Sequence, residues 1–143
     1  MIYAYNSPLG PISYEWDEIR CLHLWLQESE SGDLSDNSDP VSIWLDAYFS
    51  RQRLPLPPLA EPASEFQVIM RQGLLNVPAG EVRTYGEIAK VLHTSPRAMG
   101  QALGANPLPI LIPCHRVIAA DGLGGFACGI EWKKRLLQFE RGF

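Results

Sequence analysis

The chain has 143 residues, of which 46% are hydrophobic and 20% charged, and its formal net charge is −4. This length fits one ordinary domain or two small ones, with enough apolar residues for a core. No apolar run approaches the roughly 18 residues of a membrane span, and the N-terminus lacks the zones of a signal peptide. We therefore expect a soluble, cytoplasmic protein. Three cysteines do not make a disulfide framework, and a reducing compartment would keep them as free thiols.

The charges are divided unevenly along the chain. Residues 1–60 hold nine acidic and three basic residues, a net charge of −6, whereas the remainder holds seven acidic and nine basic residues, a net charge of +2. This asymmetry leaves the C-terminal part free to approach phosphate. An ordinary solvated surface explains the charges equally well.

The first part of the chain predicts a small antiparallel sheet with one helix. Residues 1–16 and 19–27 alternate in character, are rich in β-forming residues and are broken by turn signals. The acidic stretch 28–39 predicts a mobile loop whose role the sequence leaves open. Residues 41–50 predict a short amphipathic helix. We expect its inward side to carry Ile43, Trp44, Ala47 and Tyr48.

A proline-rich stretch marks the domain boundary. Residues 55–63 cannot continue a helix and predict a linker. It would join an N-terminal β-rich domain, residues 1–54, to a helical C-terminal domain, residues 64–143. The expected fold class is therefore α+β.

The C-terminal part carries four helical patterns, at residues 64–77, 84–93, 95–106 and 131–143. Ser64 is a plausible cap for the first of them, and Thr84 with Glu87 has the spacing of a capping box. Ser95 before Pro96 is typical of a helix start. Because a tight turn joins the second and third patterns, we expect a helix-turn-helix.

The stretch PILIPCHRVIAADG sets the thiol of Cys114 beside the imidazole of His115. A thiol attacks as its thiolate, and a reference pKa of about 8.5 leaves little of it ionised at neutral pH. Neighbouring side chains on an extended segment diverge, so His115 would act through a water or a local bend. A carboxylate would hold the imidazole tautomer, and Glu140 and Asp121 are both candidates. From spacing alone, Cys114 is either a nucleophile or a small apolar side chain.

The helix predicted at 95–106 has an unusual composition for a reader of DNA bases. Its small residues are Ala98, Gly100, Ala102, Gly104 and Ala105, and its polar side chains with some reach are Arg97, Gln101 and Asn106. Such a helix approaches a backbone or a shallow groove closely but specifies little sequence. Sequence-tolerant DNA binding and tight helix packing are both consistent with this composition.

Together these segments resemble the O6-alkylguanine-DNA alkyltransferase family, the methylated-DNA–protein-cysteine methyltransferases. The resemblance rests on PILIPCHRV, on FQ…VPAGEVRTYGEIA, on SPRAMGQALGANP and on LLQFERG, and it covers residues 64–143. SPLGPI near the start is similar to the family's first strand pair. The resemblance implies a ribonuclease H-like N-terminal domain, followed by a winged-helix-like DNA-binding and catalytic domain.

The family resemblance also implies an activity. Such a protein flips O6-alkylguanine out of duplex DNA and transfers the alkyl group irreversibly to its cysteine, so that one molecule acts once. At the matching positions, Cys114 would accept the alkyl group and His115 would be the base acting through a water. Glu140 would orient the imidazole, and Tyr85 would protonate the guanine ring.

Further roles follow from the same resemblance. Arg97 matches the side chain that replaces the flipped nucleotide, and Asn106 matches a hinge asparagine. Other expected DNA contacts are Ala98, Gln101 and Arg116. The expected pocket residues are Val117, Phe126, Ala127 and Cys128. The family usually has tyrosine at Phe126 and glycine or a bulky residue at Cys128, so the sequence does not determine the preferred alkyl group or the reaction rate.

The expected partner is duplex DNA containing O6-alkylguanine, bound by a monomer without a cofactor or membrane. Cys21 and His23 share a strand face, but further ligands with zinc spacing are missing, so no metal is expected. One alternative is a non-enzymatic alkyltransferase-like damage sensor, which would lack the cysteine. Another is a helix-turn-helix regulator, which needs side chains that reach base edges. A Cys-His hydrolase has no support beyond the pair itself.

Overall fold

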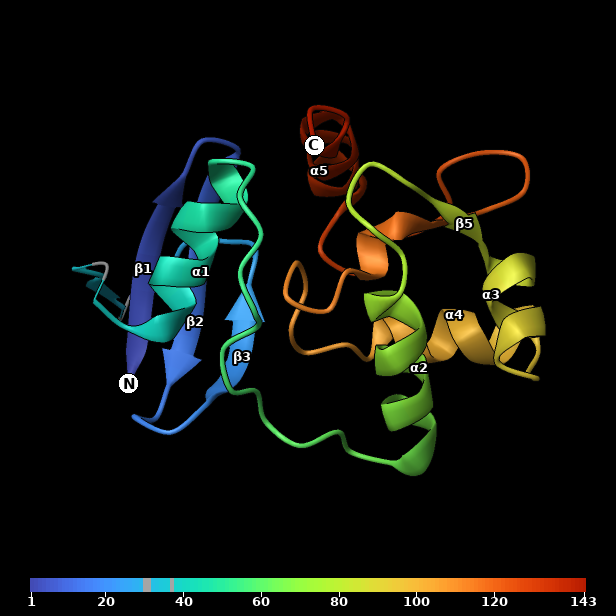
Figure 1. Cartoon of the computed structure of the whole chain (residues 1–143), viewed down its shortest axis with the longest axis horizontal. Helices are drawn as coiled ribbons and strands as arrows, with labels where there is room; N and C mark the ends of the chain where they lie inside the picture. Colours follow the sequence, from blue (N-terminus) through green and yellow to red (C-terminus); the bar gives the residue numbers. More distant parts are fainter. Residues whose placement is uncertain (30–31, 37) are drawn as a thin grey trace. The chain divides into compact units, whose positions relative to one another are not determined.

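The computed structural model describes residues 1–29, 32–36 and 38–143. The chain divides into two compact units, Met1–Glu61 and Pro62–Phe143, both drawn in Figure 1. Among the described residues, no helix has the length and apolar character needed to cross a membrane. The boundary between the units falls inside the proline-rich stretch.

The N-terminal unit is built on a four-stranded sheet with the order β3-β2-β1-β4. Its strands are β1 (Ile2–Ser7), β2 (Gly10–Trp16), β3 (Cys21–Trp25) and β4 (Asp33–Leu34). The first three pair antiparallel, as predicted. The fourth pairs parallel to β1, so the expectation of a wholly antiparallel sheet is wrong.

Strand β4 lies in the acidic stretch that was predicted as a loop. Its pairing is made by the backbone, with Tyr3 opposite Asp33 and with the Ser35 amide donating to the Ala4 carbonyl at 2.9 Å. Both β4 residues are exposed, so no hydrophobic alternation marks the strand in the sequence. Residues 30, 31 and 37 of the predicted loop lie outside the described residues.

Helix α1 (Pro40–Phe49) packs on this sheet (Figure 1). Asp39 caps the helix by accepting from the Ser42 amide at 2.9 Å, and it also accepts from the Tyr14 hydroxyl. The buried side carries Val41, Leu45 and Tyr48, which follow the i, i+4, i+7 spacing. Ile43, predicted to point inward, is 46% exposed because it lies off that stripe.

Part of the predicted linker is hydrogen-bonded to the sheet. The Cys21 amide donates to the Pro58 carbonyl, and the Ala60 amide donates to the Cys21 carbonyl, both at 2.8 Å. Leu59 thereby forms an isolated parallel bridge with Cys21 at the edge of β3. Residues 58–60 therefore belong to the N-terminal unit rather than to a free connection.

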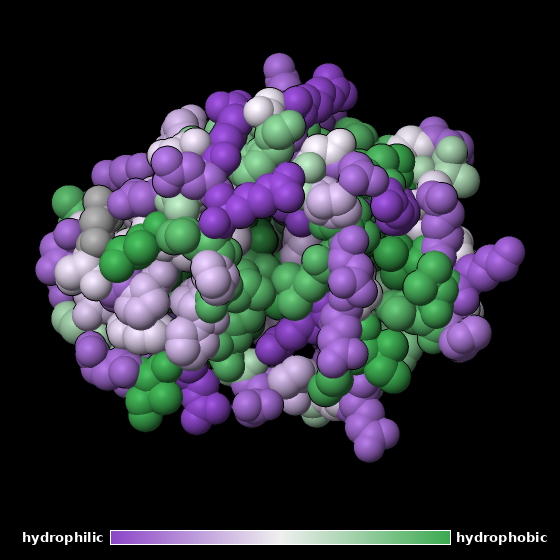
Figure 2. Space-filling model, viewed as in Figure 1, coloured by the Kyte–Doolittle hydropathy of each residue, from purple (hydrophilic) through white to green (hydrophobic). Residues whose placement is uncertain are grey.

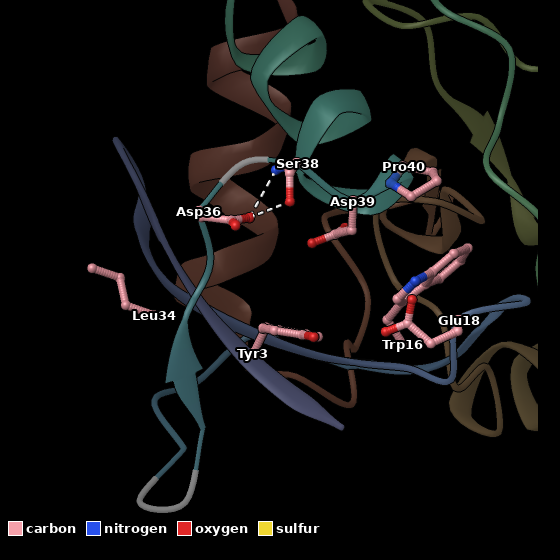
Figure 3. A pocket seen from close by; sticks show the side chains of 8 residues that line it. All are labelled: Tyr3, Trp16, Glu18, Leu34, Asp36, Ser38, Asp39 and Pro40. Atoms are coloured by element: carbon pink, nitrogen blue, oxygen red, sulfur yellow. Dashed lines mark hydrogen bonds between the residues drawn. The ribbon is translucent and has the colours of Figure 1, made fainter.

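The N-terminal unit also contains an acidic pocket of about 470 Å³. Figure 3 shows it, with the rings of Tyr3 and Trp16 and the carboxylates of Glu18, Asp36 and Asp39 among the side chains that line it. Burial and the surrounding carboxylates raise the pKa of the Tyr3 phenol. A pocket with this charge repels phosphate, so this face of the N-terminal unit does not suit a nucleic-acid backbone.

The C-terminal unit is helical, with a small parallel sheet. Its elements are α2 (Glu65–Leu75), β5 (Arg83–Thr84), α3 (Tyr85–Val91), α4 (Pro96–Gly104), the 3₁₀ turn η1 (Cys114–Arg116), β6 (Val117–Ile118) and α5 (Ile130–Glu140). The predicted caps are confirmed. Ser64 caps α2, Thr84 and Glu87 form the capping box of α3, and Ser95 caps α4 before Pro96.

Helices α3 and α4 are joined by a tight turn in which His93 adopts a left-handed φ of 55°. The two predicted helices and their turn are therefore present, packed against each other. The core of the C-terminal unit includes Met70, Leu74, Met99, Leu108 and Leu136, each at most 1% exposed. The surface drawn in Figure 2 intersperses hydrophilic with hydrophobic residues, as expected from the composition.

Candidate active site

The backbone before Cys114 turns sharply at Pro113. The Cys114 amide donates to the Ile112 carbonyl at 2.8 Å, and Pro113 has φ −79° and ψ 66°. These angles are those of an inverse γ-turn, which the fixed φ of proline favours. The 3₁₀ turn η1 follows at once and carries both Cys114 and His115, so the segment is bent where an extended chain would have separated the two side chains.

Asn106 braces the loop that leads to this turn. Its Nδ2 donates to the Ile112 carbonyl at 3.0 Å, and its Oδ1 accepts from the Leu108 amide at 3.1 Å. Ile110, between Leu108 and Ile112 in the chain, is buried and has a φ of 70°. This left-handed conformation costs a β-branched residue about 1–3 kcal/mol. The loop is thus held in a strained shape directly before Cys114.

A buried hydrogen bond joins His115 to Glu140. His115 Nε2 and Glu140 Oε2 are 2.8 Å apart, and the two side chains are 0% and 1% exposed. Because an ionised carboxylate only accepts, Nε2 carries the proton and Nδ1 keeps a free lone pair. Nδ1 is buried and has no hydrogen-bond partner within the described part of the chain. Burial lowers the pKa of His115, although Glu140 opposes that shift, so the imidazole is a neutral base near pH 7.

Arg116 fixes the other side of Glu140. Its Nε donates to Oε1 at 2.8 Å and one terminal nitrogen donates to Oε2 at 2.9 Å, while the other donates to the Val77 carbonyl at 2.7 Å. Burial alone would raise the pKa of Glu140, but hydrogen bonds from His115 and Arg116 outweigh it and hold the pKa at about 2. Arg116, expected to contact DNA, is thus engaged inside the protein. The rival carboxylate, Asp121, is exposed.

Cys114 is buried beside a lysine that sequence reasoning missed. Burial raises the pKa of the Cys114 thiol to about 11, although a hydrogen bond from Asn106 and the charge of Lys133 partly offset this. Lys133 is fully buried and donates to the carbonyls of Val117 at 2.7 Å and Gly125 at 3.0 Å. The sequence could have indicated the burial of Lys133, because Lys133, Leu136 and Glu140 follow the i, i+3, i+7 spacing of one helix side, and that side of α5 is buried.

Tyr85 approaches the same site from the start of α3. It directly follows β5, whose Thr84 pairs with Ile118 of β6, so the small sheet connects Tyr85 to the segment after Cys114. Its hydroxyl donates to the Gly125 carbonyl at 3.5 Å, and its ring centroid lies 5.9 Å from Lys133 Nζ. Burial, followed by the charge of Cys114, raises the pKa of the phenol, so Tyr85 remains a proton donor.

Gly124 makes room for that ring. It has φ 71°, and a Cβ added there would lie 3.0 Å from the Tyr85 ring and 3.1 Å from its hydroxyl oxygen. Both the backbone conformation and the close approach therefore require glycine.

Cys114 opens into a cavity of about 240 Å³. The cavity is lined by Gly100, Leu103, Gly104, Cys114, Gly125, Phe126 and Ala127. It is smaller than the roughly 300–1,000 Å³ of drug-sized sites, so it suits a small group. Of the four predicted pocket residues, Phe126 and Ala127 line it. Val117 is instead buried in β6, and Cys128 follows Ala127 in the chain.

The outer face of α4 borders this cavity and carries few long side chains, so it is called the bare face below. Arg97, Gly100, Gln101 and Gly104 are exposed, whereas Ala98 is half-buried. A Cβ added at Gly100 or Gly104 would meet nothing within 4 Å. These two glycines therefore do not serve packing within the described protein. The small residues leave an open surface, which favours close approach of another molecule.

The site combines a buried cysteine, a buried His–Glu pair and a small cavity at the edge of a helix-turn-helix, an arrangement typical of a cysteine enzyme that acts on nucleic acid. The comparisons with known proteins agree. The family model of the 6-O-methylguanine DNA methyltransferase DNA-binding domain matches residues 65–142, and the chain belongs to that family.

Named relatives match nearly the whole chain. The methylated-DNA–protein-cysteine methyltransferase of Metallosphaera sedula is 39% identical over 141 residues, which cover 96% of this chain and 90% of the relative. The protein of the same name from Sulfolobus acidocaldarius is 41% identical over 143 residues, with the same coverage of 96% and 90%.

Solved structures agree in fold. The Mycobacterium tuberculosis OGT in complex with DNA superposes with a TM-score of 0.84 at 33% identity, covering 99% of this chain and 92% of that one. The O6-methylguanine-DNA methyltransferase of Pyrococcus kodakaraensis gives a TM-score of 0.75 at 32% identity, covering 98% and 99%. The resemblance inferred from the sequence motifs and the α+β fold class are therefore confirmed.

Proposed function

We propose that this protein repairs O6-alkylguanine in duplex DNA by moving the alkyl group, once and irreversibly, to the sulfur of Cys114. The observation that carries the proposal is the position of Cys114: its thiol lines a small cavity that borders the bare face of α4. Behind it lies the buried pair of His115 and Glu140. The names of the relatives support the reaction, and the DNA complex of the M. tuberculosis protein supports the partner.

The reaction is a displacement at the alkyl carbon. The sulfur–carbon bond forms as the carbon–O6 bond breaks, and the electron pair of that bond passes to the guanine. The thiol proton moves to Nδ1 of His115 through a water, and Glu140 stabilises the imidazolium that results. The Tyr85 hydroxyl gives a proton to the guanine ring, which relieves the developing charge. Because a thioether is stable, each molecule acts once.

Proton removal matters because the free thiol is scarcely ionised. With a pKa of about 11, on the order of one thiol in ten thousand is a thiolate at pH 7. The ammonium of Lys133 favours that thiolate, and the neutral imidazole of His115 accepts its proton. These groups act together on Cys114 at the moment of attack.

DNA is held by the outer face of α4. The target atom lies inside the duplex, so the base turns out into the cavity. Unstacking and unpairing the base costs a few kcal/mol. Arg97 is exposed at the second residue of α4, and in this proposal its side chain fills the gap in the base stack. Gln101 and Ala98 contact the minor groove beside it, where little sequence information is available. Asn106 couples this helix to the turn at Cys114.

The remaining features follow the same proposal. The mixed sheet with one helix supports a ribonuclease H-like scaffold in the N-terminal unit, and the proposed linker is limited to the part of residues 55–63 that does not pair with β3. The helix-turn-helix supports a winged-helix-like domain in residues 64–143. A monomer suffices because one chain supplies every residue of the site. Free cysteines fit a reducing compartment such as the cytoplasm.

Intact mass spectrometry tests the reaction. After incubation with duplex containing O6-methylguanine, the protein gains the mass of one CH₂, and peptide mapping places it on Cys114. The Cys114→Ser variant binds the same duplex without gaining mass. A wild-type protein that binds the damaged duplex without gaining mass would be a damage sensor, and the enzyme proposal would be wrong.

The role of Arg97 needs its own comparison. Arg97→Ala slows methyl transfer from duplex by at least tenfold but leaves transfer from the free O6-alkylguanine base unchanged, because a free base has no stack to leave. Lys90→Ala, which removes an exposed charge from α3, is the matched control. Equal rates for Arg97→Ala and Lys90→Ala on duplex contradict the assignment. Strong preference for one undamaged sequence would instead favour a regulator.

A further inference from the structure

We propose that Cys114 and Cys128 form a reversible disulfide when the protein meets hydrogen peroxide, and that this bond masks the alkyl acceptor until a thiol reduces it. This inference goes beyond the proposed repair function, because it concerns the two thiols alone and requires no DNA.

The geometry brings the second thiol to the edge of the cavity. Cys114 shares that cavity with Gly125, Phe126 and Ala127, and Cys128 is the next residue. The Gly129 amide donates to the Phe126 carbonyl at 3.0 Å, which closes a four-residue turn with Ala127 and Cys128 at its centre. The two thiols also interact electrostatically.

Several glycines of the segment that carries Cys128 border open space. A Cβ added at Gly122, Gly125 or Gly129 would meet nothing within 4 Å. A disulfide needs Cα atoms within about 7 Å of each other, and consecutive Cα atoms are only about 3.8 Å apart. Ala127 lines the same cavity as Cys114, so the proposed disulfide requires the turn to bring the next residue, Cys128, within that reach of Cys114.

The difference in exposure sets the order of the chemistry. Cys128 is half-buried, whereas Cys114 is 7% exposed, so peroxide reaches Cys128 first. The Cys128 sulfur attacks one peroxide oxygen, the O–O bond breaks, and a sulfenic acid and one water result. The Cys114 sulfur, its proton taken by His115, then attacks the sulfenic sulfur. The S–S bond forms and hydroxide leaves, recovering that proton as a second water.

Two thiols are oxidised and one peroxide is reduced to two waters, so the step balances. A disulfide protects Cys114 from oxidation to sulfinic acid, which thiols do not reverse. For a protein whose acceptor is used once, such a lesion would remove the molecule before it reached damaged DNA. The disulfide keeps the acceptor recoverable.

Cys21 provides a matched control. It lies in β3 of the N-terminal unit, is 0% exposed, and its thiol hydrogen-bonds to the His23 carbonyl at 3.5 Å. Burial raises its pKa to about 12, so it offers little thiolate to an oxidant. Cys21→Ser therefore leaves the proposed disulfide in place.

The experiment treats the reduced full-length protein with one equivalent of hydrogen peroxide. We expect the intact mass to fall by two hydrogens and a non-reducing digest to join the peptides of Cys114 and Cys128. Methyl transfer falls at least tenfold and returns on addition of dithiothreitol. Cys21→Ser behaves as wild type, whereas Cys128→Ser loses no hydrogens. Each variant is compared with its own reduced form.

Three results overturn the inference. They are oxygen addition without hydrogen loss in the wild type, a disulfide that pairs other cysteines, and hydrogen loss that persists in Cys128→Ser. The mass measurement does not depend on repair. Absence of methyl transfer in the reduced protein would therefore contradict the proposed function while the disulfide was still tested.

Discussion

Replacing Arg116 by alanine tests whether this residue serves the buried carboxylate rather than DNA. The side chain makes two hydrogen bonds to Glu140 and one to the Val77 carbonyl, and it is only 11% exposed. Removing it leaves Glu140 buried with His115 as its remaining hydrogen-bond partner among the interactions described above. The cost should therefore be that of breaking a buried ion pair.

The structure sets the size of this cost. Hydrogen bonds from His115 and Arg116 lower the pKa of Glu140 from 4.5 to about 2 in spite of burial, and together they give about 3 kcal/mol of net stabilisation of the ionised form. Breaking a buried pair by removing one partner typically costs about 3–5 kcal/mol. We expect Arg116→Ala to lower the free energy of unfolding at pH 7 by about 3 kcal/mol.

The pH dependence follows from the sign of the shift. A depressed carboxyl pKa means that the unfolded chain binds the proton more readily, so the stabilisation is complete above pH 4.5 and is lost as pH falls toward 2. Wild type therefore loses stability across this window, and Arg116→Ala loses less. The charge of Arg116 also lowers the pKa of His115. Without the charge of Arg116 the pKa of His115 rises. The acid limb of the pH–rate profile, where protonation of His115 slows methyl transfer, therefore moves to higher pH.

Urea denaturation at several pH values and single-turnover transfer against pH are the two assays. Arg83→Ala is the control, because the ion pair of Arg83 with Glu81 is 36% and 53% exposed and is worth at most about 1 kcal/mol. Arg116→Lys keeps the charge but loses the two-pronged contact, so its acid limb stays near wild type. Equal stability of Arg116→Ala and Arg83→Ala, or an unmoved acid limb in Arg116→Ala, would refute the reasoning.

Three further predictions concern the same site. Glu140→Gln leaves His115 without its carboxylate, so single-turnover methyl transfer should slow by about 10²-fold, whereas duplex binding measured by fluorescence anisotropy stays the same. Asn106→Ala removes hydrogen bonds to Ile112 and Leu108 and should lower the free energy of unfolding by about 1–3 kcal/mol in urea titrations. An unchanged free energy of unfolding would contradict the bracing role of Asn106. Lys133→Met removes the buried cation and should raise the pKa of Cys114. We expect slower alkylation of the thiol by iodoacetamide at neutral pH, and an unchanged rate would contradict the role of Lys133.

Several features were determined by the sequence alone because they depend on near neighbours. The caps at Ser64, Thr84 and Ser95 need a side chain and an amide two or three residues away. The first three strands follow from alternation along the chain. The motif around Cys114 is equally local, and its resemblance to a known family, which the comparisons confirm, predicted Cys114 as the acceptor.

The tertiary structure decided the features that join distant segments. Strand β4 pairs through its backbone and carries no hydrophobic pattern, so only the folded sheet reveals it. Gly100 and Gly104 were compatible with packing or with an open surface until the space around them was known.

The choice of the carboxylate shows the physical reason most clearly. Asp121 is nearer to His115 in sequence, yet Glu140, 25 residues away, makes the hydrogen bond because α5 packs against the turn that carries Cys114. The same packing buries Lys133 beside the thiol and turns Arg116 inward. Local sequence predicted the nucleophile, whereas the burial and the hydrogen bonds that together shift the pKa values of His115 and Glu140 depend on the packing of α5.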